Sequence, residues 1–465
     1  MRTTGSGPGY RFMARPVILA VVVLLLAVGC ASSSDETPTP PSPTVAPTPT
    51  TAAPTPTVAA PEPQEEEGDV VDLIAYVGLD SNIFTIRPDG TDQRQLTFPI
   101  SRETVSLLFT GQEESVFNWP TWSPDATRIA YTGFSEQGAF PGSLYVVNAR
   151  GGPSRELYQN PPDTVGRFVA TRSPHYIYWA PDSQRIAFLA PSSFNLTLFV
   201  IKADGSEQAR PLANGAPSYL SWSPNGRYLL LHLLEDLLLV DTSRDLVPSP
   251  LAPDSSAFRA PSWAPDSQSI AYIDRLNGTD GLVVGDLTGA DGEVVTTIDQ
   301  LGVFLWSPSA NHLAFTTLIP RPDLPVPTYT GLNVIDTDTS ERYRITEDEV
   351  VAFFWSPDGG KLAYVTVDRV NGLFSWNVTD SRGNDRQKLA DFTPSSETLF
   401  TLFQFFDQYA YSNSLWSPDS DSLVYAGREP GTDGTGTDRV FVLPVDGITP
   451  PRAIAQGTLA FWSPR

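Results

Sequence analysis

A tripeptide that begins with tryptophan recurs along this chain and constrains its fold more than any other feature. Each copy reads Trp-Ser-Pro or Trp-Ala-Pro, and the copies take eight of the ten tryptophans: Trp122, Trp179, Trp222, Trp263, Trp306, Trp355, Trp416 and Trp462. Proline presets the backbone for a tight turn, and the Asp or Asn that usually follows tolerates the next turn position. A repeat of this regularity indicates one structural unit used many times.

Apolar residues return at fixed distances after each of the first seven tryptophans. An aliphatic residue stands seven positions later, at Ile129, Ile186, Leu229, Ile270, Leu313, Leu362 and Leu423. Two positions further comes an aromatic residue in six copies, at Tyr131, Phe188, Tyr272, Phe315, Tyr364 and Tyr425, and Leu231 in the other. Two apolar strands joined by a Pro-containing turn are typical of a hairpin. With two more short strands per unit, roughly 40 to 60 residues make one propeller blade.

The two ends of the repeat region complement each other. Residues 73–97 supply strands two to four of a blade without a tryptophan strand, and Phe461-Trp462 supply a first strand with nothing after it. Pairing them would remove two exposed sheet edges. The sequence therefore predicts an all-β protein, a β-propeller of four-stranded blades closed by the C-terminal strand on the N-terminal blade. The units predict eight blades, or seven if one unit is not a blade.

The repeat resembles that of a known family. Trp355-Ser-Pro-Asp-Gly359 followed by Lys361-Leu-Ala-Tyr364, and Pro88-Asp-Gly-Thr91 leading to Arg94-Gln-Leu-Thr97, are similar to the WD40-like repeat of TolB-type propellers, over about residues 70–465. The same repeat class occurs in propeller domains of the dipeptidyl peptidase and prolyl oligopeptidase families, whose hydrolase is a separate domain. The resemblance implies a propeller that takes part in envelope protein interactions. TolB proteins carry an α/β domain before the propeller, so the TolB role itself is not carried over.

The N-terminal residues predict export and lipid anchoring. Three arginines precede the apolar run 17–28, which is short for a membrane span and typical of a secretory signal. Leu26-Ala-Val-Gly-Cys30 resembles a bacterial lipoprotein signal, so we expect a signal peptide at 1–29 and a lipid on Cys30. The alternative is a chance cysteine in a signal that is simply removed. Residues 30–68 hold ten prolines and predict a disordered Thr/Pro-rich tether before the propeller at 69–465.

The charge of the chain limits its partners. The formal net charge is -23, and only three residues are lysine. Nucleic-acid binding rests on neutralising phosphates, so nucleic acid is excluded as an expected partner. The same charge repels anionic lipid and favours a soluble monomer, with the membrane reached only through lipidated Cys30.

The long loops are predicted to share one face of the propeller. They connect second to third strands or neighbouring blades: 98–119, 132–142, 159–176, 316–331, 391–414 and 427–438. One-sided loop growth on a rigid scaffold is typical of a binding face, although exposed loops also tolerate neutral insertion. Arg167 and His175 of the loop 159–176 are candidate ligand-binding residues.

The loop 391–414 carries most of the candidate site. A helix is expected to start at Thr393-Pro394, with Leu399, Leu402, Phe403, Phe406 and Ala410 on one side. One interpretation is a short helix packed on the rim as extra core, and the other is an exposed aromatic ledge that holds a partner or a glycan. The candidate ligand-binding residues are Phe400, Phe403, Phe405, Phe406 and Tyr409.

Residues for catalysis are few. No Gly-x-Ser-x-Gly motif occurs, and the three histidines, His175, His232 and His312, stand in different blades without metal-ligand spacing. We therefore predict no catalytic residue, no metal and no cofactor. The expected function is an extracytoplasmic, lipid-anchored, non-enzymatic propeller that binds an envelope protein, peptide or glycan. Two alternatives remain: a hydrolase or lyase with its site in the propeller mouth, and a gating partner of a separate peptidase.

Overall fold

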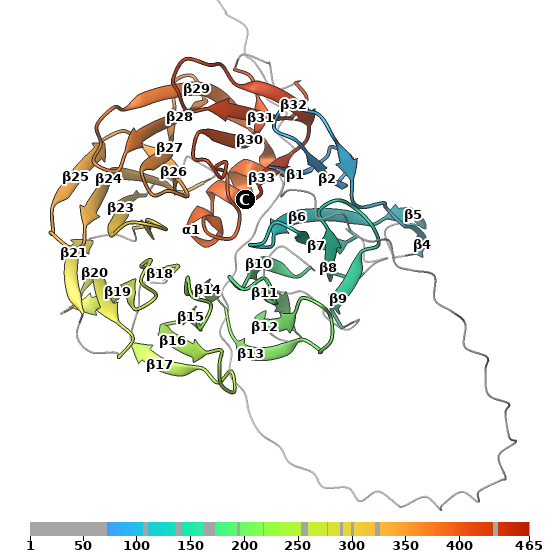
Figure 1. The fold of residues 1–465 in the computed structure, drawn as a ribbon, viewed down its shortest axis with the longest axis horizontal. Coiled ribbons are helices and arrows are strands. Elements are labelled where there is room, and N and C mark those ends of the chain that lie inside the picture. The colour runs from blue at the N-terminus through green and yellow to red at the C-terminus, as the bar shows by residue number, and fades with distance from the viewer. Residues whose placement is uncertain are drawn as a thin grey trace, which may run out of the picture. The chain divides into compact units, whose positions relative to one another are not determined.

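The computed structural model describes residues 72–464, except 106–109, 136–140, 162–172, 193–195, 217, 253–258, 277, 289–291, 299–301, 321–325 and 431–435. The described residues belong to one compact unit, Glu67–Arg465. In this unit the sheets are arranged in a ring around a short helical segment (Figure 1). Arg167 and Cys30, like the signal and the tether, lie outside the described residues.

The strands are short, antiparallel and grouped in fours, as the repeat predicts. Four groups are separate sheets: β6 (Val116–Trp122), β7 (Arg128–Phe134), β8 (Ser143–Asn148), β9 (Arg155–Gln159); β10 (His175–Trp179), β11 (Arg185–Pro191), β12 (Leu196–Lys202), β13 (Arg210–Asn214); β14 (Ser218–Trp222), β15 (Tyr228–Leu233), β16 (Asp236–Asp241), β17 (Ser249–Ala252); β18 (Ser262–Trp263), β19 (Ser269–Leu276), β20 (Thr279–Asp286), β21 (Glu293–Ile298).

The strands that follow belong to one continuous sheet. It contains β22 (Phe304–Trp306), β23 (His312–Ile319), β24 (Thr328–Asp336), β25 (Arg342–Thr346), β26 (Val350–Trp355), β27 (Lys361–Asp368), β28 (Leu373–Asp380), β29 (Gln387–Pro394), β30 (Ser422–Arg428), β31 (Arg439–Pro444) and β32 (Arg452–Gln456). Short pairings of β24 with β26 and of β29 with β30 join units that the repeat would separate. The blade count therefore stays a prediction.

The last strand completes the first sheet. β33 (Leu459–Trp462) pairs antiparallel with β1 (Ile74–Val77), and β2 (Ile83–Ile86) and β3 (Arg94–Gln95) continue the sheet outward. This is the pairing of the two chain ends that the sequence predicts. Trp462 lies opposite Ile74 in this pairing. The sheet therefore consists of one strand from the C-terminal end of the chain, β33, and three strands from near residue 72, β1 to β3.

Six of the Pro-containing turns share one geometry, which the sequence explains, and the turn after Trp306 differs because the Ala310 N–H donates to the Ser307 hydroxyl. In the first copy the Ala126 N–H donates to the Ser123 carbonyl at 2.8 Å, and the Asp125 carboxylate accepts the Thr127 N–H at 3.0 Å. The fifth residue of the turn has a positive φ, +59° at Ala126 and +69° at Gly359. Glycine relieves the cost of this conformation, and the side chain of Asp or Asn stabilises the turn around it.

Six of the eight motif tryptophans also connect two neighbouring groups of strands. The exceptions are Trp306, whose indole N–H has no partner among the described residues, and Trp462, which donates to the Asp72 carboxylate. The Trp179 indole N–H donates to the Thr121 carbonyl at 3.0 Å, and Thr121 directly precedes the preceding motif tryptophan. The same bond recurs from Trp222, Trp263, Trp355 and Trp416 to Tyr178, Ser221, Leu305 and Phe354. Trp122 donates to Phe461 of β33 at 3.2 Å. Because donor and acceptor are both buried, each bond fixes the spacing between adjacent groups of strands.

The residue six positions after a motif tryptophan covers the next motif tryptophan. The Arg128 guanidinium lies 5.0 Å from the Trp179 ring centre, and Arg185 lies 5.4 Å from that of Trp222. His312 occupies this position too and stacks on Trp355 with ring centres 6.3 Å apart. The three arginine and histidine side chains therefore have a packing role between neighbouring groups of strands.

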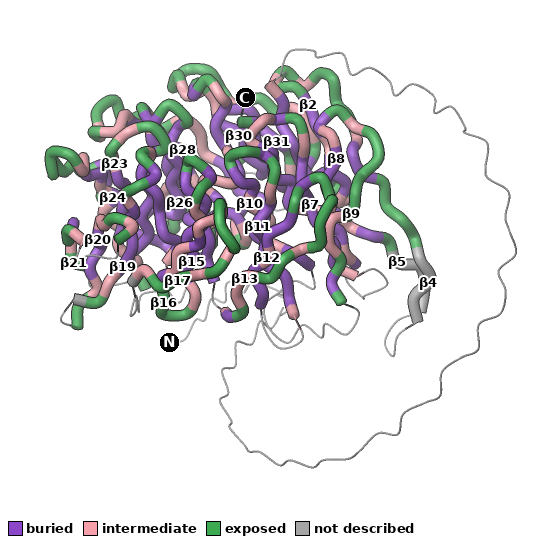
Figure 2. Tube along the Cα trace, turned by 60° about the horizontal axis from the view of Figure 1, so that its bottom comes forward, coloured by how far each residue is buried: buried purple, intermediate pink, exposed green. Residues whose placement is uncertain are grey.

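The predicted apolar positions form the core. All seven aliphatic residues of the repeat and the residues two positions after them are buried. Figure 2 shows that the buried residues run along the strands and that exposed residues concentrate in the turns. The prediction of a repeat-based β core is confirmed.

Several segments that the sequence assigned to long loops are partly strand. Residues 98–119 contain the hairpin β4 (Ser101–Val105) and β5 (Thr110–Glu114), which pairs only with itself, and then β6. Residues 316–319 and 328–331 extend β23 and β24, and 391–394 extend β29. The loop prediction was wrong there because polar and Pro-containing ends of strands still hydrogen-bond to their neighbours.

The inter-group tryptophan bond predicts a difference between two similar substitutions. Trp416 is 1% exposed and donates to Phe354, whereas Trp306 is 2% exposed and its indole N–H has no partner among the described residues. We expect Trp416→Phe to lower the free energy of unfolding by about 1–3 kcal/mol more than Trp306→Phe, because it leaves the buried Phe354 carbonyl without its hydrogen-bond donor. Urea unfolding measures both, and equal losses would mean that the bond contributes nothing.

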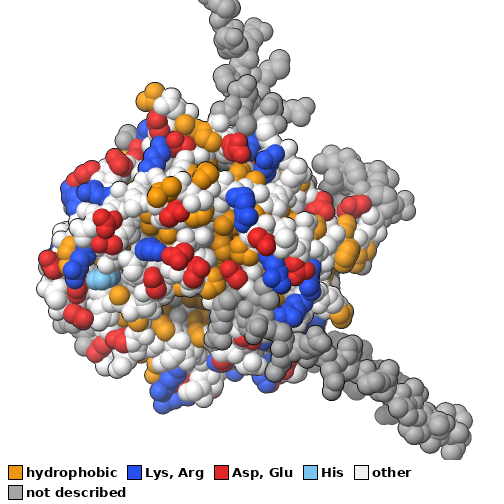
Figure 3. All heavy atoms as spheres, turned by 45° about the horizontal axis from the view of Figure 1, so that its top comes forward, with side chains coloured by type: hydrophobic (Ala, Val, Ile, Leu, Met, Phe, Trp, Pro, Cys, Tyr) orange, Lys and Arg blue, Asp and Glu red, His pale blue; other side chains and the backbone are white. Residues whose placement is uncertain are grey.

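The acidic turns predict a loss of stability in acid. In Asp358, partial burial pushes the carboxyl pKa up, but hydrogen bonds from Ser356 and the Gly360 N–H outweigh it and hold the pKa below its usual value. The Ser417 hydroxyl does the same for Asp419, and the Ser243 hydroxyl chiefly lowers the pKa of Asp241 to about 2. Figure 3 shows acidic side chains interspersed with basic ones on one face.

These lowered pKa values stabilise the folded chain above the unfolded pKa of about 4, and the stability is lost as pH falls toward the folded values. We expect the free energy of unfolding, measured in urea, to fall steadily from pH 4 to pH 2. Asp358→Asn should flatten part of this fall and keep the turn, because Asn225 already accepts the same N–H bond at 2.9 Å. A stability that is constant down to pH 3 would contradict the prediction.

Candidate functional site

Residues 395–414, here called the plug, leave the end of β29 and lie in the middle of the ring of sheets (Figure 1). The plug contains a π-helix η1 (Thr398–Phe403) and a short α-helix α1 (Phe406–Tyr409). Its side chains contact β6, β10, β24 and β26, which lie far apart in the sequence. The plug therefore occupies the place where a propeller has its channel.

The local sequence explains where the helix begins. The Ser395 carbonyl accepts the Leu399 N–H at 2.9 Å, and its hydroxyl accepts the Thr398 N–H at 3.1 Å. Serine at this position caps a helix because its side chain satisfies a free N–H. The expected start at Thr393-Pro394 was wrong, since both residues still pair with Arg428 and Gly427 of β30.

Aromatic rings hold the plug in place. The Phe406 ring lies 5.0 Å from that of Phe353 and 5.9 Å from that of Tyr329. The Tyr409 ring lies 4.3 Å from that of Trp119 and 5.5 Å, edge to face, from that of Tyr176. Edge-to-face and tilted pairs at these distances add to the energy of burial.

Two strained residues turn their rings toward Tyr409. Trp119 has a φ of +61° and Tyr176 a φ of +50°, and both lie three residues before a motif tryptophan. The pairing of β6 and of β10 shifts register at these points. A bulky residue with positive φ is a real outlier, and a β-bulge re-aims its side chain. The strain is held because Tyr409 packs against both rings.

Polar bonds fix the end of the plug to three separate strands. The Tyr411 hydroxyl donates to the Trp306 carbonyl at 2.7 Å and lies 2.8 Å from the Ser262 hydroxyl. The Asn413 amide donates to the Pro120 carbonyl at 3.2 Å. These bonds satisfy backbone groups that would otherwise be left without partners in the centre of the ring.

The plug carries one buried acid. Asp407 is 7% exposed, and its Oδ2 atom has no hydrogen-bond partner among the described residues. Burial raises its pKa, and the nearby Arg259 guanidinium works against that rise. Burial also raises the pKa of Tyr176, Tyr219 and Tyr329, and the Asp407 charge adds to each rise.

Arg259 is itself held by a histidine. The His232 Nδ1 atom lies 2.8 Å from the Arg259 carbonyl oxygen, and His232 is buried. This contact gives His232 a structural role beside the plug.

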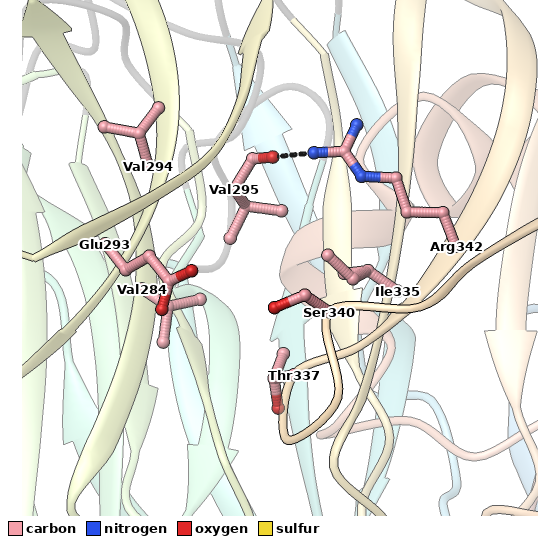
Figure 4. Close-up of a pocket in the computed structure, with 8 residues that line it drawn as sticks. All are labelled: Val284, Glu293, Val294, Val295, Ile335, Thr337, Ser340 and Arg342. Atoms are coloured by element: carbon pink, nitrogen blue, oxygen red, sulfur yellow. Dashed lines mark hydrogen bonds between the residues drawn. The ribbon is translucent and has the colours of Figure 1, made fainter.

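Two cavities lie away from the plug, between neighbouring groups of strands. The first has about 100 Å³ and lies between β20–β21 and β24–β25 (Figure 4). Val284, Val295 and Ile335 make its apolar walls, and the Arg342 guanidinium donates to the Val295 carbonyl beside it. The second, about 440 Å³, lies beside the turns at Asn225 and Asp266. Neither cavity brings together a nucleophile, a base and an oxyanion donor.

The structure divides the predicted ligand-binding residues. Phe403, Phe406 and Tyr409 are buried in the plug, whereas Phe400 and Phe405 are 46% and 36% exposed. The three buried rings are extra core, although the core lies in the centre of the ring and not on its rim. His175 is the first residue of β10 and not a loop residue, and burial lowers its pKa. Phe400, Phe405 and His175 are not fully buried, and Arg167 lies outside the described residues. Ligand binding by the seven candidates remains a prediction.

Sequence reasoning missed the residues that receive the plug. Trp119, Tyr176 and Tyr219 stand three positions before successive motif tryptophans, and Arg259 lies near Asp407 of the plug. The aromatic residues at this fixed spacing were a usable signal. In the described ranges no group of three or more His, Cys, Asp or Glu side chains could hold a metal ion. Among the same residues no helix has the length and apolar character to cross a membrane.

The packing of the plug predicts unequal effects of two phenylalanine substitutions. Phe406→Ala should lower the free energy of unfolding by about 3–5 kcal/mol, since it leaves a cavity among buried rings. Phe400→Ala should change it by no more than about 0.5 kcal/mol, because the side chain is half exposed. Urea unfolding of the two variants is the measurement. A large loss in Phe400→Ala, or a small one in Phe406→Ala, would show that the plug is packed differently.

Comparisons with known proteins give information on the fold. No protein-family model and no curated protein matches the chain. TolB from Acinetobacter baumannii is 15% identical with a TM-score of 0.39, over 75% of this chain and 66% of the TolB chain, slightly less than two thirds of its length. A manganese-bound oligogalacturonate lyase is 12% identical, with a TM-score of 0.43 over 77% and 85% of the two chains.

A structure described as the eukaryotic initiation factor has a TM-score of 0.50. It is 11% identical over 85% of this chain and 98% of its own. Similarity at such identities shows the fold alone. Together with the antiparallel four-stranded groups arranged in a ring, it assigns the architecture: the chain is an all-β protein with a β-propeller fold.

Proposed function

We propose that this chain is an extracytoplasmic, lipid-anchored binding module that presents one face of its propeller to a partner in the cell envelope. It acts without catalysis of its own. The main support is the uneven distribution of exposed apolar side chains, and the plug gives the second argument.

Exposed apolar side chains concentrate at one edge of the sheets. Of the ten large hydrophobic side chains exposed in the described parts of the chain, seven lie in connections from second to third strands or from a fourth strand to the next first strand: Leu79, Phe98, Ile100, Leu234, Val370, Phe400 and Phe405. Because neighbouring strands are antiparallel, these two kinds of connection share one edge. Val247 and Ile448 lie in turns at the opposite edge, and Val294 lies within β21. Apolar groups gathered on one face favour an interaction site there.

The filled centre of the ring supports a binding role. Propeller enzymes assemble a site from several blades around the channel, and here Phe406, Asp407 and Tyr409 of the plug occupy that space. Their polar and aromatic contacts are used to hold the plug. The outer loops are then the surface that is left for a ligand.

Anchoring rests on the N-terminal sequence. The Leu26–Cys30 segment resembles a lipoprotein signal, and the Thr/Pro-rich residues after Cys30 would hold the head away from the membrane. An acidic head with a net charge of -23 is repelled by anionic lipid, which fits a partner other than the bilayer surface.

Crosslinking capture from an envelope extract tests the face. We expect the full chain to enrich a partner, a Leu79→Ser/Phe98→Ser/Val370→Ser variant to lose it, and a Val247→Ser/Ile448→Ser variant of the opposite edge to keep it. A Cys30→Ala variant should leave the membrane fraction. Equal capture by the two surface variants would contradict the proposed face, and no capture above a bait-free control would contradict the proposed function.

Asp407 is the observation that favours an enzyme instead. A buried carboxylate with an unpaired oxygen beside Arg259 has the altered pKa of many catalytic acids. A hydrolase or lyase with its site in the propeller mouth would use it, and turnover of envelope glycans or peptides would then disappear in Asp407→Asn. The same burial equally fits a structural charge, so this function ranks second.

A further inference from the structure

We propose that the plug is a pH-sensitive closure of the propeller: it is held in the ring while Asp407 carries a proton, and it loosens when Asp407 becomes a carboxylate. This inference goes beyond the proposed function, because it concerns the centre of the ring and does not depend on which partner the loops bind. It rests on the surroundings of Asp407 and on two strained residues that the plug packs against.

Asp407 brings an acidic group into the centre of the ring. It belongs to the short helix α1, whose residues Phe406 and Tyr409 pack among buried rings. Asp407 itself is 7% exposed, and its Oδ2 atom has no hydrogen-bond partner among the described residues. A buried carboxylate with an unpaired oxygen is costly, and a neutral carboxylic acid in the same place costs much less.

The titratable and charged groups around Asp407 come from several elements of the ring. The Arg259 guanidinium, before β18, is the cation that acts on its carboxyl. His232 of β15 contacts the backbone of Arg259, with 2.8 Å between its Nδ1 atom and the carbonyl oxygen. The Asp407 charge also acts on four tyrosines, and burial raises the pKa of each above its usual value of about 10: Tyr176 of β10, Tyr219 of β14, Tyr329 of β24 and Tyr409 of α1. These tyrosines and Arg259 keep their charge state between pH 4 and pH 8, so Asp407 and His232 are the groups here that can titrate.

The direction of the pH effect follows from burial. Burial raises the pKa of Asp407, and the Arg259 guanidinium and the N–H groups of Ala260 and Gln408 oppose this rise without cancelling it. In the unfolded chain an aspartate has its ordinary pKa of about 4. The protonated plug is therefore fully stabilised below that value, and the stabilisation is lost as pH rises through the higher folded pKa. This direction is opposite to that of the turn aspartates, whose contribution is lost as pH falls below about 4.

Movement of α1 away from the centre relieves a second cost. The Tyr409 ring packs 4.3 Å from that of Trp119 and 5.5 Å from that of Tyr176, and these two residues have φ angles of +61° and +50°. Backbone strain of this kind persists only where neighbouring packing maintains it. The N-cap residue of α1, Phe405, makes no side-chain capping bond. Loss of the Asp407 proton and relaxation of the strained residues therefore favour the same movement.

The contacts on either side of α1 contain no group that titrates in this range. The Ser395 hydroxyl accepts the Thr398 N–H at 3.1 Å at the start of the plug. The Tyr411 hydroxyl donates to the Trp306 carbonyl at 2.7 Å near its end. The loosening is therefore confined to the residues around α1, and the ring of sheets stays closed.

Hydrogen exchange of the full chain between pH 4 and pH 8 tests the proposal, with each rate divided by that of an unstructured peptide at the same pH. The Ala410 N–H donates to the Phe406 carbonyl at 2.9 Å, so peptides that cover 404–413 report on α1. We expect their protection to fall by at least about tenfold from pH 4 to pH 8, while peptides around Val424 keep theirs. Asp407→Asn, which is always neutral, should remove this dependence. Glu397→Gln, which removes the other acidic residue of the plug, should keep it.

Urea unfolding gives a second measurement. Asp407→Asn should be more stable than the parent at pH 8, and the difference should disappear at pH 4. The turn aspartates cancel in this comparison because both proteins carry them and they are distant from α1. Asp407→Ser, with a smaller neutral side chain, replaces the Asn variant in both measurements if that variant does not fold.

Three results would overturn the proposal. The first is protection of α1 in the parent that does not change with pH. The second is a pH dependence that the neutral variants retain, which would assign it to another group such as His232. The third is a neutral variant that is less stable than the parent at pH 8, because Asp407 would then be held in the ring as a stabilising charge.

Discussion

The hydrogen bond that six of the eight motif tryptophans donate to the preceding first strand is the interaction on which the rest of the structure depends. A short four-stranded group buries too little surface to be stable alone, so the groups must be held at a fixed spacing. The indole ring fills that space, and its N–H ends on the carbonyl before the preceding motif tryptophan, as in Trp355 to Leu305 at 3.0 Å. Trp122 continues the series to Phe461, so the two chain ends are joined by the same bond as their neighbours.

The arrangement of the first strands around the ring determines the space that the plug fills. First strands held at equal spacing around a centre leave a space lined by the residues three positions before each tryptophan, among them Trp119, Tyr176 and Tyr219. Positive φ angles in Trp119 and Tyr176 and the unpaired oxygen of Asp407 are local costs. They persist because aromatic packing around Phe406 and Tyr409 outweighs them. The same plug carries the exposed side chains of Phe400 and Phe405.

Several charged side chains in the described parts of the chain have structural roles. The turn aspartates accept N–H bonds of their own turns, and arginines tie neighbouring groups together, as when Arg386 donates to the Ile345 carbonyl at 2.8 Å and Arg452 to the Pro88 carbonyl at 2.6 Å. The strongly negative net charge therefore excludes some classes of partner without selecting a ligand, and the uncharged aromatic and apolar positions of the loops give more information about one.

The sequence by itself determined the repeat, the buried positions and the partner of the last strand. Each depends on spacing within one repeat unit. Trp122 and Ile129, seven residues apart, pair across one turn, and this pairing does not depend on where the unit lies in the chain. Tertiary structure alone decided how residues 391–414 fold and which residues they contact. A helical pattern shows that one side of a segment is buried, but not what buries it, and the partners of Tyr409 lie more than 200 residues away at Trp119 and Tyr176. The π-helix at Thr398–Phe403 likewise follows from how the segment fits the ring, because no residue pattern distinguishes it from an α-helix.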